Sequence, residues 1–370
     1  MMRKPAGNIS RRVPALPIYR KEVISMKKKL PALLLALLLS LAACGQADPG
    51  NPGGGASQEA EPETAPNQEA EPLYTVRVAA LKGPTAMGLV KLMHETDNQA
   101  GQPLGEYEFT LAASADEVTP RLIKGELDVA CVPANLAAVL YNRTEGEIVT
   151  LAVNTLGVLY IVENGEAVQS MADLRGKTIV AAGKGSTPEY GLRYLLKENG
   201  LDPDQDVAID WKSEHAECVA ALASGAASIA LLPQPFVTVA QGKLPGLRAA
   251  LDLTAEWEAL DNGSAMITGV AVARRAFVEE HPEETERFLL DYAESAAWTG
   301  GHTAEAAALI GEYGIVEAAV AEKALPYCNI VCLTGQEMAD KLSGYLEVLY
   351  DADPASVGGA LPDGDFCYGA

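Results

Sequence analysis

The sequence is poor in histidine, in aromatic residues and in positive charge. It has four His, 6% aromatic residues, and 28 Lys plus Arg against 50 Asp plus Glu, for a net charge of −22. Such an acidic chain is repelled by nucleic-acid phosphates, which excludes general nucleic-acid binding. The scarcity of aromatic rings argues against a base-stacking platform, and the few histidines argue against a histidine-rich metal enzyme.

Common enzyme motifs are also missing. The segment Gly183-Lys184-Gly185-Ser186 lacks the spacing of a phosphate-binding loop, and no Gly-x-Ser-x-Gly occurs. His94 has no second histidine at the zinc spacing, and His215 with Cys218 offers only two metal ligands. The sequence therefore predicts a protein that is not an enzyme, with no catalytic residues, no metal and no cofactor.

What is present begins with an export signal. Three lysines follow Met26, residues 32–39 are apolar, and Leu41-Ala42-Ala43 precede Cys44. This order predicts a signal peptide over residues 26–43, and its end resembles a bacterial lipobox, whose cysteine is diacylated. An ordinary signal peptide with an incidental cysteine is the alternative. Residues 1–25 are interpreted as the product of a mis-set start codon or as an unusual leader, so residues 1–43 are left out of the fold.

A tether is predicted over residues 44–72. After Cys44 this segment contains no Leu, Ile, Val, Phe, Tyr or Trp, so it cannot bury enough apolar surface to offset its conformational entropy. Two acyl chains anchor a protein stably where one does not. The lipid at Cys44, and not charge, is therefore expected to hold the protein at the membrane.

The remaining 298 residues are globular in composition and alternate strands with helices up to about residue 273. Period and turn signals predict strands at 74–81, 107–112, 127–132, 178–182, 207–211, 228–232 and 266–273, and helices at 85–95, 188–198, 214–224, 282–297, 303–311 and 336–348. A capping box is expected at 114–117, and Asn154-Thr155 are read as an interruption of the apolar run 148–162. This order predicts a parallel-rich α/β fold.

The loops after successive strands are rich in small and helix-capping residues. In open α/β sheets, ligands bind at the carboxyl ends of strands, where helix N-termini present unpaired N–H groups. Several such loops in one crevice would form a site for a small polar or anionic molecule.

The order of these loops resembles a known family. The chain resembles bacterial solute-binding proteins of ABC importers, in the sulfonate, nitrate and thiamine-precursor group. The segments that carry the resemblance, over about residues 73–370, are 81–88, 124–130, 132–137, 173–179, 185–190, 232–236 and 353–366.

The resemblance implies a two-lobe type II periplasmic-binding-protein fold. Lobe 1 would comprise residues 73–160 with 267–370, and lobe 2 residues 161–266, with crossovers near Ile161 and Ser264–Ile267. The ligand would lie between the lobes, and closure about the crossovers would bury it.

The ligand residues that the resemblance implies lie in the loops between strands and helices: Thr85, Ala86, Ser114, Pro133, Asn135, Ser186, Thr187, Glu189 and Gln234. Lys82, Gly83 and Gly185 of the same loops are further candidates. Asn154 and Thr155, which interrupt the apolar run near the first crossover, are candidate cleft residues too, with a turn between two strands as the alternative. Gln234 departs from the family, which often has Glu there, and this weakens the case for a cationic ligand. Lys82 and Lys184 are possible partners of an anion, although each is also readily explained as a solvated surface charge.

The implied function is that of an extracytoplasmic, lipid-anchored receptor. It would be a monomer that captures a sulfonate-, nitrate- or pyrimidine-precursor-like solute and delivers it to an ABC permease with its ATPase, with no nucleic-acid partner. A sensory or scaffold lipoprotein that reuses the fold is the alternative. An enzyme similar to thiamine-pyrimidine synthases ranks last, because it needs a histidine in the cleft.

Five cysteines remain after Cys44: Cys131, Cys218, Cys328, Cys332 and Cys367. The number is odd, so at least one has no partner within the chain. An extracytoplasmic location permits disulfides, and Cys328 can be paired with Cys332 or Cys367. The sequence leaves their redox state open.

Overall fold

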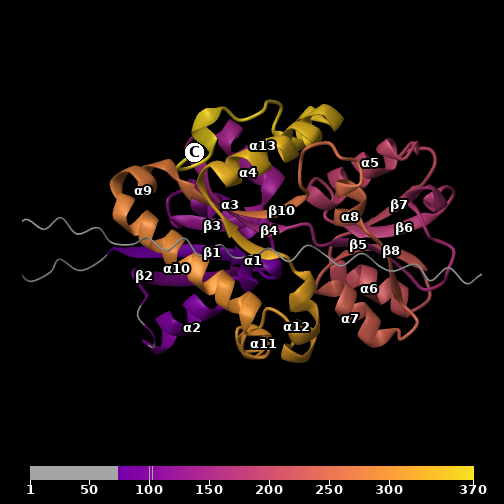
Figure 1. Ribbon diagram of the computed structural model, residues 1–370, viewed down its shortest axis with the longest axis horizontal. Helices are drawn as coiled ribbons and strands as arrows, with labels where there is room; N and C mark the ends of the chain where they lie inside the picture. The colour runs from indigo at the N-terminus through magenta and orange to yellow at the C-terminus, as the bar shows by residue number, and fades with distance from the viewer. Residues whose placement is uncertain (1–73, 100, 102) are drawn as a thin grey trace, which may run out of the picture. The chain divides into compact units, whose positions relative to one another are not determined.

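A computed structural model describes residues 74–99, 101 and 103–370 of the chain. The predicted signal peptide, Cys44 and the predicted tether lie outside the described residues. In the described part, the strands form two sheets, one of six strands and one of five, with helices packed on both faces of each (Figure 1).

The six-stranded sheet has the order β11-β4-β10-β3-β1-β2. Its strands are β1 (Thr75–Leu81), β2 (Glu106–Ala112), β3 (Val129–Pro133), β4 (Ile148–Leu156), β10 (Ile267–Arg274) and β11 (Ile330–Leu333). β1 is parallel to both β2 and β3, whereas β10 runs antiparallel between β3 and β4.

The five-stranded sheet has the order β7-β6-β8-β5-β9. Its strands are β5 (Leu159–Glu163), β6 (Thr178–Ala182), β7 (Ala208–Lys212), β8 (Ile229–Pro233) and β9 (Arg248–Asp252). β6 is parallel to β7 and β8, and β5 is antiparallel to β8 and β9. The chain therefore passes from the first sheet to the second between β4 and β5, and returns after β9.

Helices cover the sheets and turn their apolar side chains toward them. Those near the first sheet are α1 (Pro84–Met87), α2 (Val90–Asn98), α3 (Ala115–Ile123), α4 (Ala134–Arg143), α9 (Arg275–Glu280), α10 (Pro282–Gly301), α11 (Thr303–Glu312), α12 (Ala318–Ala324) and α13 (Gly335–Ala352). Those near the second are α5 (Thr187–Glu198), α6 (His215–Ala223), α7 (Phe236–Lys243) and α8 (Leu253–Glu258). Short 3-10 turns are η1 (Met171–Leu174), η2 (Leu325–Tyr327), η3 (Pro354–Val357) and η4 (Gly364–Phe366).

The apolar core is divided by the faces of the sheets. α1, α2 and α10 pack on one face of the first sheet, and α4 and α13 on the other. In the second sheet, α6 and α7 cover one face, while α5 and α8 cover the opposite face (Figure 1). The cluster under α4 and α13 continues under α5 and α8, so one body of buried side chains spans both sheets.

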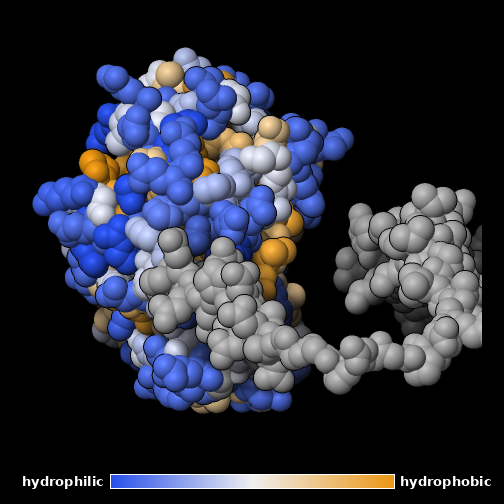
Figure 2. Space-filling view, turned by 90° about the vertical axis from the view of Figure 1, so that its left-hand side faces the viewer, coloured by the Kyte–Doolittle hydropathy of each residue, from blue (hydrophilic) through white to orange (hydrophobic). Residues whose placement is uncertain are grey.

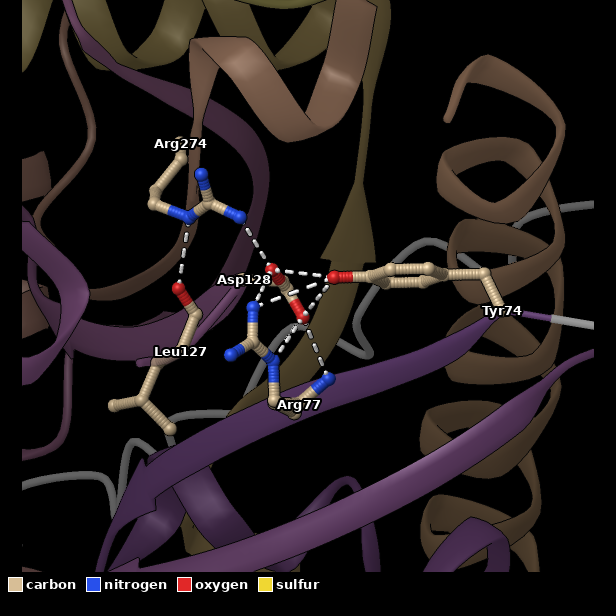
Figure 3. A network of polar contacts seen from close by, with 5 residues as sticks. All are labelled: Tyr74, Arg77, Leu127, Asp128 and Arg274. Carbon is tan, nitrogen blue, oxygen red and sulfur yellow. Dashed lines mark hydrogen bonds and ion pairs between the residues drawn. The ribbon is translucent and has the colours of Figure 1, made fainter. Parts of the chain in front are cut away.

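A charged network holds three strands of the first sheet together at the end opposite the α1 loop (Figure 3). Asp128 is fully buried and accepts hydrogen bonds from Arg77 Nε at 2.8 Å and from Arg274 Nη2 at 2.6 Å. Tyr74 donates to the same carboxylate at 3.2 Å. Burial alone would raise the pKa of Asp128, but the arginine hydrogen bonds and charges lower it below its ordinary value. The carboxylate thus links β1 and β10 to the start of β3.

The surface is polar. Hydrophilic residues dominate the face in Figure 2, with small apolar patches between them. The large apolar side chains exposed in the described residues come from different elements and loops: Leu104, Ile123, Leu290, Tyr327 and Leu361.

Three local expectations were wrong. The helix expected at 85–95 is two helices, α1 and α2, separated at Gly88, where a Cβ atom would lie 3.0 Å from Ile330 Cγ2. The alternative of a turn at Asn154-Thr155 is wrong, because both residues lie inside β4, where β10 and β11 pair with Thr155. The Ser114 hydroxyl donates to Glu117 Oε1 at 3.2 Å and caps no helix N–H, so the capping box does not form.

Candidate ligand site

The predicted site residues lie where strands of the two sheets end and helices begin. Lys82, Gly83, Thr85 and Ala86 follow β1, and Pro133 and Asn135 join β3 to α4. In the second sheet, Gly185 and Ser186 join β6 to α5, Thr187 and Glu189 lie in the first turn of α5, and Gln234 follows β8. The first turns of α4 and α5 leave N–H groups unpaired and carry partial positive charge, which favours an anion or a polar oxygen nearby.

Two loops from different sheets are in direct contact. Asn135 is 2% exposed, and its Nδ2 donates to Gly185 O at 3.4 Å and to Ser356 O at 3.2 Å. Beside this contact, Tyr345 of α13 donates to Thr187 Oγ1 at 3.2 Å. The structure therefore brings Asn135 together with Gly185 and Thr187, although Asn135 and Gly185 are 50 residues apart in the sequence.

A second group gathers at the end of β4 and β10. A Cβ atom on Gly269 would lie 2.6 Å from both Asn154 Oδ1 and Thr85 Cγ2, so glycine is required there. The Thr155 hydroxyl donates to Asn154 Oδ1 at 3.0 Å, and the Thr85 hydroxyl donates to Leu81 O at 2.9 Å. Thr85, Asn154 and Thr155 are thus neighbours, and each is at least nine-tenths buried.

The backbone beside two of the loops faces open space. Gly83 and Gly185 have φ angles of 139° and 77°, which side chains rarely adopt. A Cβ atom added at either position would meet nothing within 4 Å. A ligand can therefore approach the backbone of both loops closely.

Other predicted residues are engaged locally. Glu189 accepts a hydrogen bond from Gly185 N at 2.7 Å, so its carboxylate occupies an amide of the α5 loop. Gln234 is buried, and its Oε1 accepts from the Thr238 hydroxyl at 2.9 Å. Ser114 is exposed and pairs with Glu117 on its own helix. Glu189 is thus joined to the Asn135 group through Gly185, whereas the side chains of Gln234 and Ser114 share no hydrogen bond with that group among the described residues.

The two lysines remain available to an anion. Lys82 and Lys184 are exposed at the ends of β1 and β6, and within the described residues neither has a carboxylate at salt-bridge distance. They supply positive charge next to the loops in an otherwise acidic protein.

Two residues of this region escaped the sequence reasoning, and a third, His215, entered it only as one of two possible metal ligands. Thr254 of α8 packs against Gly157 in the first crossing, and Thr268 lies in β10 where the chain has returned to the first sheet. The hydroxyls of both are buried without a hydrogen-bond partner among the described residues. His215 opens α6, with its ring centroid 5.2 Å from that of Phe236, and burial lowers its pKa to about 4. A histidine therefore does lie close to the Gln234 loop, which the sequence did not indicate. No motif marks any of the three.

The structure shows the state of the five cysteines that follow Cys44 in the sequence. Cys131, Cys218, Cys328, Cys332 and Cys367 are all free thiols there, so Cys328 is paired with neither Cys332 nor Cys367. Burial raises the pKa of the Cys131 and Cys328 thiols to about 12.

In residues 74–99, 101 and 103–370, no three His, Cys, Asp or Glu side chains group to hold a metal ion. None of the helices over these same ranges is both long and apolar enough to cross a membrane.

Several solved structures share the fold. An ABC transporter protein from Parabacteroides distasonis aligns with a TM-score of 0.67 and 23% identity, over 79% of this chain and 98% of its own. The periplasmic aliphatic sulphonate binding protein SsuA from Escherichia coli aligns with a TM-score of 0.63 and 18% identity, over 80% of this chain and 92% of its own. The periplasmic nitrate-binding protein NrtA from Synechocystis PCC 6803 aligns with a TM-score of 0.52 and 15% identity, over 67% of this chain and 69% of its own. No curated protein sequence matches.

The family model for the phosphonate periplasmic substrate-binding protein of ABC transporters matches residues 91–324, more than half of the chain. Together with the shared fold, this confirms the expected group and its two-lobe type II periplasmic-binding-protein architecture. The chain belongs to this family of periplasmic substrate-binding proteins of ABC transporters.

Proposed function

We propose that this protein is a lipid-anchored receptor that captures a small polar or anionic organic solute between two lobes and delivers it to an ABC permease and its ATPase. The lobes are taken as residues 73–160 with 267–370 and residues 161–266. The contact between Asn135 and Gly185 carries the proposal, because it joins loops at the carboxyl ends of strands from both sheets.

The chemistry of the loops favours a polar or anionic solute. Ser186 and Thr187 carry hydroxyls beside the start of α5, Asn135 lies in the first turn of α4, and Lys82 and Lys184 bring positive charge. Hydrogen bonds from N–H and O–H groups to a charged oxygen are about twice as strong as those to a neutral one. Sulfonates, phosphonates and carboxylates therefore fit this donor set better than cations do.

Release without chemical change is part of the proposal. A receptor of this kind binds its solute, closes about the crossovers and gives the solute up unaltered. A sensory lipoprotein with the same site would also bind and close, so binding alone does not separate the two roles. Uptake of the labelled solute by cells that carry the matching permease does separate them.

The test uses the chain with Cys44→Ser, which keeps it free of lipid. Thermal unfolding is measured with sulfonates, phosphonates, pyrimidines and aromatic acids, and titration calorimetry follows for those that raise the melting temperature. At least one oxyanion is expected to stabilise the protein and to be recovered intact. A solute that is converted, or a panel in which no oxyanion binds, would contradict the proposal.

A further inference from the structure

The two sheets share more than the two chain segments that cross between them. Tyr345 of α13, which packs on the first sheet, and Trp257 of α8, which packs on the second, are both fully buried, and their ring centroids are 5.6 Å apart. Tyr194 of α5 follows, with its ring centroid 4.7 Å from that of Trp257. Aromatic pairs at such distances attract each other beyond the effect of burial alone. These rings extend one apolar core from α13 across α8 to α5 (Figure 1).

Hydrogen bonds reinforce the contact of α13 with the helices of the second sheet. The Tyr345 hydroxyl donates to Thr187 Oγ1 at 3.2 Å, and Trp257 Nε1 donates to Ser264 Oγ at 2.9 Å, in the segment that returns to the first sheet. A Cβ atom on Gly344 would lie 3.3 Å from Ser264 Cβ, so α13 packs directly on that segment. Moving α13 away from α8 would break these bonds and expose two large aromatic side chains to water, which is unfavourable.

The opposite edge between the sheets is built differently. There α12 contacts α7 (Figure 1), but the buried apolar side chains of the described residues form two separate clusters, one around α11 and α12 and one around α6 and α7. Glu322 and Lys323 of α12 are exposed, as are Gln241 and Lys243 of α7. Because no buried apolar cluster spans this contact, α12 and α7 separate with little loss of the hydrophobic stabilisation that grows with buried area.

We propose that the contact of α13 with α8 and α5 is the fixed axis about which the lobes turn, and that the protein opens when α12 and α7 separate. The inference rests on the proposed function, since it uses the lobes defined there. Both crossings adjoin this axis: Ser264 lies against α13, and Gly157 of the first crossing lies so close to Thr254 of α8 that a Cβ atom has no room. A rotation about packed side chains needs backbone changes in only a few residues of such crossings.

This axis has a consequence for the candidate ligand residues of the second sheet. Thr187 is bonded to Tyr345, so it stays beside the first lobe in the open state. Gln234 lies just before α7, so it moves away with the opening edge. A solute is therefore expected to enter between α12 and α7, and not between α13 and α5.

The test measures the distance between two spin labels in the full chain without added solute. One pair reports on the opening edge, with Glu322→Cys on α12 and Gln241→Cys on α7. The other reports on the axis, with Asp351→Cys on α13 and Glu198→Cys on α5. All four positions are exposed. The background carries Cys44→Ser, Cys332→Ser and Cys367→Ser, because the other three thiols are buried and so are shielded from the label.

Pulsed dipolar spectroscopy is expected to give one narrow distance for the α13–α5 pair. For the α12–α7 pair it is expected to give a distribution at least about twofold wider, with a second and longer distance from the open state. Equal widths for the two pairs, a wider distribution for the α13–α5 pair, or a single narrow distance for both pairs would overturn the inference.

A variant and a matched control test the cause. Trp257→Ala is expected to widen the α13–α5 distribution toward that of the α12–α7 pair. Phe288→Ala is the control, because Phe288 is also a fully buried aromatic residue but packs in a cluster confined to the first sheet. It is expected to leave both distributions unchanged, and melting curves show that each variant folds. A narrow α13–α5 distance in folded Trp257→Ala would overturn the inference; if that variant does not fold, the two pairs in the background chain decide by themselves.

The failure of the inference and the failure of the proposed function are distinguishable, because the label distances need no solute. Distances that contradict the axis overturn the inference while the solute panel still decides the proposed function. A panel in which no oxyanion binds contradicts the proposed function, whatever distances the labels give.

Discussion

Replacing Asp128 with Asn is predicted to lower the stability of the folded part strongly. The carboxylate is fully buried, and the substitution keeps its shape but removes the charge that faces Arg77 and Arg274. Breaking a buried ion pair costs about 3–5 kcal/mol, since the remaining charge is left uncompensated. The two arginine side chains are 32% and 21% exposed, so water rehydrates them in part. We therefore expect about 3 kcal/mol, near the lower end of that range.

The assay is equilibrium unfolding in urea and by heat. A loss of this size corresponds to a melting temperature lower by about 5 °C, because a domain of about 300 residues unfolds with an entropy of about 0.6 kcal/mol/K. The matched control is Asp204→Asn, because Asp204 also accepts two hydrogen bonds from one arginine, Arg193, at 2.9 and 2.7 Å, but is 68% exposed. An exposed pair of this kind contributes only about 0–1 kcal/mol. Equal losses for the two variants would refute the reasoning.

The pH dependence of the same variant gives a second check. The folded pKa of Asp128 is lower than its ordinary value of 3.8. The contribution of its charge is therefore fully present above the unfolded pKa and is lost as pH falls through the folded pKa. The difference between the wild type and Asp128→Asn should be constant near neutral pH and shrink in acid. A difference that persists in strong acid would show that charge is not its cause.

Three further predictions concern the site and the anchor. Burial holds the pKa of His215 near 4, against 6.5 in the unfolded chain. As pH falls from 6.5 toward 4, the wild type should therefore lose more free energy of unfolding than His215→Gln does. Urea titrations in which the free energy of unfolding falls equally with pH for both proteins would contradict this. Ser186→Ala or Thr187→Ala should weaken solute binding by about 1–3 kcal/mol in calorimetry, and unchanged affinity in both would remove the α5 loop from the site. If the proposed lipid at Cys44 anchors the protein, Cys44→Ser should release it from membranes in a fractionation experiment, because stable attachment then depends on the two acyl chains. Continued sedimentation of the variant with membranes would contradict that proposal.

Much of the architecture could be predicted because the strands that build the centre of each sheet carry strong local signals. The strand expected at 178–182 is β6, and the loops that follow β1, β3, β6 and β8 were all anticipated. The edge strands β9 and β11 were missed. They are only five and four residues long and largely half-exposed, so they show neither a continuous apolar run nor a clear alternation.

The site was harder to predict than the fold. Loops that start helices have recognisable residues, and this led to Asn135, Ser186 and Thr187. Asn154 looked like a break in an apolar run, but antiparallel pairing on both sides keeps its segment in a strand. Thr268 owes its position to a bulge, which depends on the register between two strands more than 100 residues apart. No local pattern records such a register.

The position of β10 has a consequence for the order of folding during export. All strands of the five-stranded sheet come from residues 159–252, so they are available as one continuous stretch of the emerging chain. The six-stranded sheet needs β10 between β3 and β4, so these two strands cannot be joined until residue 274 has crossed the membrane, and β11 completes the sheet only at residue 333. Until then β3 and β4 present open hydrogen-bonding edges, which invite wrong pairing with other chains. The later half of the polypeptide thus covers strand edges that the earlier half leaves open.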